Sequence, residues 1–177
     1  MNKKFVETVL GFYSWIRMLL EARIFKAFSQ KKIEYKEDKW EEAKNLNIFE
    51  FDKLINEYPY KSDKWGGLLD MSFPVDKPGY FFSDLDWGRD CDDYARIWAL
   101  YLKLHGWEEV TEVIVLDSKK PFSTAHVVTV AKLNGRYSLF NYEKYGNFNT
   151  FENAINYMTA WKSYPSETFV WKKYKEY

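Results

Sequence analysis

The chain contains a single cysteine, Cys91, so it excludes an internal disulfide framework and any cysteine-rich zinc site. Helical spacing of apolar residues after it predicts a helix over 91–105, with Asp90 as the N-cap and Gly106 as the C-cap. A thiol at a helix N-terminus is exposed to the positive end of the dipole, which favours the thiolate. Cys91 is therefore a candidate nucleophile, and the competing interpretation is a small buried apolar residue.

Three acidic neighbours, Asp90, Asp92 and Asp93, oppose this effect because negative charge raises the pKa of a thiol. A nucleophile at this place therefore needs a compensating cation, either a protonated histidine or a metal ion. The chain has two histidines. His105 lies 14 residues further along the same predicted helix, about 21 Å away, and cannot reach the thiol. His126 is left as the candidate base.

The dipeptide Asn134-Gly135 predicts a tight hairpin loop between two strands. With this loop, His126 is expected opposite Glu143, and Asn141 lies diagonal to His126, about 7–8 Å away between backbones. Either side chain could hold the imidazole in one tautomer. Nucleophile, base and orienting residue are the groups that acyl-transfer enzymes combine.

The elements that must position these residues follow from hydrophobic periodicity. The pattern predicts strands over 110–116, 125–133, 136–142 and 168–171, and helices over 3–29, 48–57, 91–105 and 150–161. Residues 30–47 are polar and predict a solvated connector that includes a short helix. Residues 58–88 predict a long irregular segment rich in Pro and Gly.

Residues 88–95, Gly-Arg-Asp-Cys-Asp-Asp-Tyr-Ala, resemble the nucleophile motif of the transglutaminase-like superfamily, and most closely that of bacterial transglutaminase-like cysteine proteinases. The upstream residues Tyr60, Asp63, Trp65 and Gly66 are also similar to that family. So are Ala125-His126-Val127-Val128, Gly135-Arg136-Tyr137 and Phe140-Asn141, which resemble its histidine strand, turn and acid strand. The resemblance covers about 60–145. Arg89, Asp92 and Asn141 depart from the usual pattern.

The resemblance implies an α+β fold with a papain/transglutaminase-like core, in which the Cys91 helix packs on an antiparallel sheet and an extra N-terminal helix is present. It implies a probable cysteine peptidase or amidase acting on a protein or peptide substrate through Cys91, His126 and Asn141. Trp65 and Trp87 become candidates for the oxyanion site or groove wall. No cofactor is required, although relatives bind calcium through acids that correspond to Asp90 and Asp92. The alternatives are a catalytically silent binding module and a cross-linking or deamidating transglutaminase.

Composition and charge limit the kinds of partner that the chain is expected to bind. Its 177 residues carry 26 basic and 26 acidic side chains, so no global field favours nucleic acid or an anionic membrane. Glu7 and Arg17 interrupt the apolar stretch near the N-terminus, which argues against a membrane span or a signal peptide and for a cytoplasmic protein. Residues 1–47 are expected to form a helical extension packed on a peptidase domain over 48–177. The helix 3–29 is alternatively a docking element for a partner.

Overall fold

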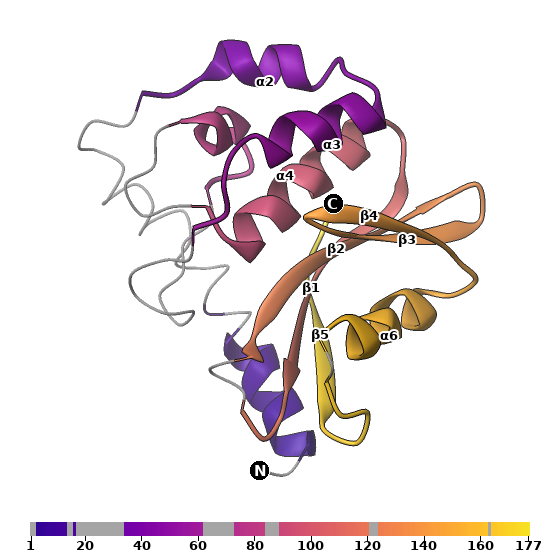
Figure 1. Ribbon diagram of the computed structural model, residues 1–177. Coiled ribbons are helices and arrows are strands. Elements are labelled where there is room, and N and C mark those ends of the chain that lie inside the picture. The colour runs from indigo at the N-terminus through magenta and orange to yellow at the C-terminus, as the bar shows by residue number, and fades with distance from the viewer. Residues whose placement is uncertain are drawn as a thin grey trace.

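The computed structural model describes residues 3–13, 16, 34–61, 73–83, 89–120, 124–162 and 164–177. These residues form an α+β fold around a five-stranded antiparallel sheet with the strand order β4-β3-β2-β1-β5 (Figure 1). The strands are β1 (Glu108–Asp117), β2 (His126–Leu133), β3 (Arg136–Asn141), β4 (Glu143–Phe148) and β5 (Phe169–Glu176). The helices are α2 (Glu37–Ala43), α3 (Ile48–Asn56), the 3₁₀ helix η1 (Pro78–Phe82), α4 (Cys91–Leu104) and α6 (Phe151–Trp161), with a further helical segment over 3–13.

Helices cover both faces of the sheet, with α4 on one face and α6 on the other (Figure 1). Because side chains alternate along a strand, each face has its own core. Ala131 and Phe140 pack in the cluster around α4, whereas Val128, Val130 and Leu139 pack in the cluster around α6. This alternation therefore determines on which face of the sheet each site residue lies.

Helix α4 occupies the predicted position within one residue. Its N-cap Asp90 accepts a hydrogen bond from the Asp92 backbone N–H at 3.3 Å, and Gly106 follows the helix with a positive φ of 74°. On the buried face, Phe51 of α3 stacks on Tyr101 with ring centroids 3.8 Å apart. The aromatic contacts between α3 and α4 fix the axis of α4, and with it the place of Cys91.

The described part of the N-terminal segment packs on the sheet beside α4. Val6 and Leu10 are buried in a cluster with Ile114 and Val127, whereas Phe5, at 58% exposure, lies on the opposite side of the helix. Residues 17–29 of the predicted helix lie outside the described residues. No helix within the described ranges is both long and apolar enough to cross a membrane.

Two expectations from the sequence were wrong. The short helix expected within residues 30–47 is present as α2, but it is not solvated, because Trp40 and Ala43 are buried in the same core cluster as α4. The second error is that no strand was expected directly after β3, whereas β4 lies there and pairs with β3. The polar sequence of residues 143–148 carries no strong strand pattern, and the turn that begins β4 has an unusual backbone described below.

Candidate active site

Cys91 is the first residue of α4 and its side chain is half-buried. It packs against the apolar cluster that includes Ala95, Ile114 and Val127, between the helix and the sheet. The thiol therefore lies where the helix N-terminus meets the sheet, which is the placement that the sequence predicts.

Arg89, one of the departures from the family pattern, anchors the approach to this helix. Its guanidinium donates hydrogen bonds to the carbonyls of Phe81 and Ser83 and lies 4.8 Å from the ring centroid of Tyr58. Its own carbonyl accepts from the Lys61 backbone N–H at 2.9 Å. Arg89 therefore ties the residues before Cys91 to η1 and to the end of α3, a role that its sequence position does not reveal.

His126 and Asn141 form a buried hydrogen-bonded pair. His126 is the first residue of β2 and Asn141 the last residue of β3, and their side chains are 5% and 4% exposed. The His126 Nε2 and Asn141 Oδ1 atoms are 2.5 Å apart. The loop at Asn134-Gly135 sets the register expected for this hairpin, so the diagonal contact is confirmed.

Glu143 does not lie opposite His126, which corrects the expectation from the hairpin register. Strand β3 ends at Asn141, and Tyr142 adopts a left-handed backbone with φ of 57°. The chain therefore reverses, and Glu143 pairs with Asn141 as the first residue of β4. An aromatic residue in this conformation costs about 1–2 kcal/mol, so the turn was not predictable from local propensity.

The His126 ring is held in its neutral form. The pKa of His126 is lowered to about 4, and burial is the largest cause; the hydrogen bond to Asn141 opposes this shift, and the nearby Lys162 charge adds to it. Because a carbonyl oxygen only accepts, Nε2 carries the proton that is donated to Asn141 Oδ1, and the ring lone pair lies on Nδ1. A neutral imidazole with its lone pair on Nδ1 can act as a general base.

Strand alternation assigns His126 to the face covered by α6, because it pairs with Val115 in the α6 cluster. Cys91 packs against the cluster on the opposite face, and Tyr142 directly follows the end of β3. The Tyr142 ring lies 5.8 Å from the ring of His126 and 5.0 Å from that of Tyr94, three residues after Cys91.

The charges of Lys162 and Cys91 contribute to the pKa shifts of neighbouring groups. Burial lowers the pKa of Lys162 and the Cys91 charge opposes this effect, while Lys162 in turn lowers the pKa of His126. Burial raises the pKa of Tyr142, and the Cys91 charge is the next largest cause. Lys162 therefore interacts with both Cys91 and His126. The sequence analysis did not identify Lys162 or Tyr142, because neither belongs to a recognisable motif.

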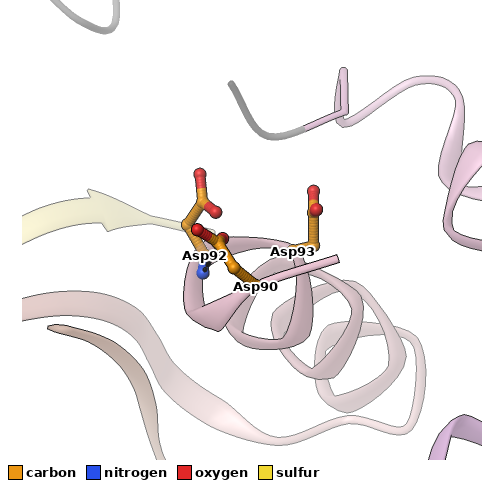
Figure 2. A group of neighbouring side chains, drawn as sticks. All are labelled: Asp90, Asp92 and Asp93. Carbon is orange, nitrogen blue, oxygen red and sulfur yellow. Dashed lines mark hydrogen bonds between the residues drawn. The ribbon is translucent and has the colours of Figure 1, made fainter. Parts of the chain in front are cut away.

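Three carboxylates, those of Asp90, Asp92 and Asp93, gather at the first turn of α4 (Figure 2). One oxygen from each lies within 4.8 Å of the others, and all three residues are buried. The Asp93 carboxylate also accepts a hydrogen bond from the Phe73 backbone N–H at 3.4 Å. Hard oxygen ligands at this separation fit Ca²⁺. Asp93 extends the pair Asp90 and Asp92 predicted from the sequence.

The remaining predicted site residues, Trp65 and Trp87, lie outside the described residues. Of the predicted site, the structure therefore brings His126 and Asn141 into direct contact and places Cys91 at the adjoining end of α4.

Comparison with known proteins gives little further information. No family model matches the chain, and no curated protein matches it. Among solved structures, Legionella pneumophila LapG matches with a TM-score of 0.38 and 19% sequence identity. The match covers 60% of this chain and 60% of the LapG chain. The two proteins share at most a distant relationship. The α+β architecture and the contacts described above are therefore drawn from the structure of this chain alone.

Proposed function

We propose that this protein is a cysteine-nucleophile acyl-transfer enzyme that hydrolyses a peptide or amide bond through Cys91, His126 and Asn141. The observation that carries the proposal is the 2.5 Å hydrogen bond between His126 Nε2 and Asn141 Oδ1, two side chains that are both buried. Among the described residues, the buried Asn141 Nδ2 atom has no hydrogen-bond partner. Such an atom costs about 1–3 kcal/mol, which supports a functional rather than a stabilising role for the pair.

The proposed reaction starts from a neutral thiol and a neutral imidazole, because the low pKa of His126 disfavours the ion pair. His126 Nδ1 accepts the Cys91 proton while Sγ attacks the carbonyl carbon of the substrate. The Cys91 backbone N–H, at the positive end of α4, is the candidate donor to the oxyanion. Nδ1 then protonates the leaving amine, and water attacks the thioester to release the acid and restore the thiol.

Acylation of Cys91 by p-nitrophenyl acetate tests this proposal without knowledge of the natural substrate. We expect His126→Ala to slow acylation at pH 7 at least tenfold, because the general base is lost. The measurement is p-nitrophenol release together with the mass of the intact acyl-enzyme. His105→Ala is the matched control, since His105 caps the far end of α4 against the Lys44 carbonyl. Equal rates for wild type and His126→Ala would contradict the proposal and favour a binding module.

We also propose that Asp90, Asp92 and Asp93 hold a calcium ion. A bound cation would offset the negative charge beside Cys91 and so favour its deprotonation. Titration of the protein with CaCl₂ in a calorimeter is expected to show one binding event that Asp92→Asn weakens at least tenfold. Asp76→Asn, which removes an exposed acid distant in sequence from the cluster, is the control. A heat signal that is identical in wild type and Asp92→Asn would exclude this site.

A further inference from the structure

Tyr142 has a backbone conformation that its side chain disfavours. The described non-glycine residues with positive φ are Glu109, Asn134, Tyr142 and Asn147. Asparagine tolerates the left-handed region, whereas a bulky aromatic residue rarely adopts it. The strained residue directly follows Asn141, one partner of the buried pair. Strain of this kind persists only where the surrounding structure holds it, and it is concentrated at functional positions.

Contacts from other elements hold the Tyr142 residue in place. Its ring packs edge-on against Tyr94 of α4, with centroids 5.0 Å apart, and against Tyr60, with centroids 5.3 Å apart. Its backbone carbonyl accepts a hydrogen bond from Asn56 Nδ2 at 3.3 Å. The ring is therefore fixed by the helical side of the protein and not only by the strand that carries it.

The same ring lies against His126, with the two ring centroids 5.8 Å apart. His126 belongs to the sheet face opposite α4, and the left-handed turn at Tyr142 ends β3 directly after Asn141. The Tyr142 ring contacts both Tyr94 of α4 and the His126 imidazole. An apolar cover strengthens an enclosed hydrogen bond, because it excludes water that would compete for the donor and acceptor.

We propose that Tyr142 is a positioning residue whose ring covers His126 and keeps water from its hydrogen bond with Asn141, so that the proton stays on Nε2. The inference deepens the proposed function and rests on it, since this tautomer leaves Nδ1 as the base. The ring is the acting group, and the hydroxyl is not required. Burial raises the pKa of the phenol, so it remains neutral.

Nuclear magnetic resonance of protein labelled with ¹⁵N-histidine tests the proposal directly. In wild type and in Tyr142→Phe, we expect the His126 Nε2–H proton to be visible and slow to exchange with water. In Tyr142→Gly, which accepts the positive φ without strain, we expect its exchange to be at least tenfold faster. His105 serves as the internal reference in every spectrum, and Phe49→Ala, which deletes an 80% exposed ring on α3, is the control substitution.

Unchanged exchange in a folded Tyr142→Gly protein would overturn the inference, and circular dichroism establishes that the fold is kept. If Tyr142→Gly does not fold, Tyr142→Leu is used instead, because leucine replaces the flat ring by an apolar side chain that covers less of His126. The same measurement of His126 Nε2–H exchange then tests the inference. The proposed function fails separately. If acylation of Cys91 does not depend on His126, the proposed triad is wrong, whatever the exchange rate of the His126 proton. If acylation depends on His126 but the exchange rate does not depend on Tyr142, only the positioning role of Tyr142 is wrong.

Discussion

Replacing Arg96 by Met is expected to lower the free energy of unfolding by about 3–5 kcal/mol, because it leaves the Glu112 carboxylate buried without its partner. The Arg96 Nε and Nη2 atoms lie 3.2 and 3.3 Å from the two carboxylate oxygens of Glu112. Both side chains are at most 1% exposed. Arg96 Nη1 also donates to the Phe73 carbonyl at 2.8 Å, and the Tyr177 hydroxyl donates to Glu112. The loss would therefore loosen α4 on β1.

Urea unfolding followed by circular dichroism measures this effect. The matched control is Lys132→Met, which breaks the partly exposed ion pair with Glu109 and should cost under about 1 kcal/mol. The double variant Arg96→Met with Glu112→Leu should regain most of the lost stability, because no charge is then left buried. A single-variant loss as small as that of Lys132→Met would show that Glu112 is solvated or protonated and that the pair does not hold α4.

Lowering the pH from 7 to 5 is expected to cost about 2 kcal/mol of unfolding free energy through His126 alone. The folded-state pKa of about 4 lies below the ordinary histidine pKa of 6.5. The unfolded chain therefore binds more protons between these two values, and stability is lost as the pH falls from about 6.5 to 4. Above pH 7 both states are neutral at this residue, and no dependence remains.

His126→Gln identifies the source of this loss, because glutamine keeps polarity and does not titrate. The difference in stability between pH 7 and pH 5 should shrink by about 2 kcal/mol in this variant. Direct titration of the His126 ring by nuclear magnetic resonance gives the same answer independently. A ring that protonates near pH 6.5 would contradict the burial-driven shift and would restore the ion pair as the resting state of the site.

The sequence by itself determined the local elements of the site. Asp90 and the apolar periodicity after it defined α4 to within one residue, and Asn134-Gly135 fixed the register that brings Asn141 to His126. These features depend on contacts between residues close in the chain, namely a helix cap and a two-residue turn, whose geometry follows from residue type.

Only the tertiary structure decided how the two sides of the site meet. The reversal at Tyr142, which moved Glu143 into β4, opposes local propensity and is held by Tyr94 and Asn56 from other elements. The neutral state of His126 depends on burial and on the charge of Lys162, 36 residues further along the chain. Such effects arise from packing between distant segments, so they cannot be predicted from the neighbouring residues in the sequence. The chain therefore specified its candidate chemical groups locally, whereas the protonation state and covering of those groups were set by the fold.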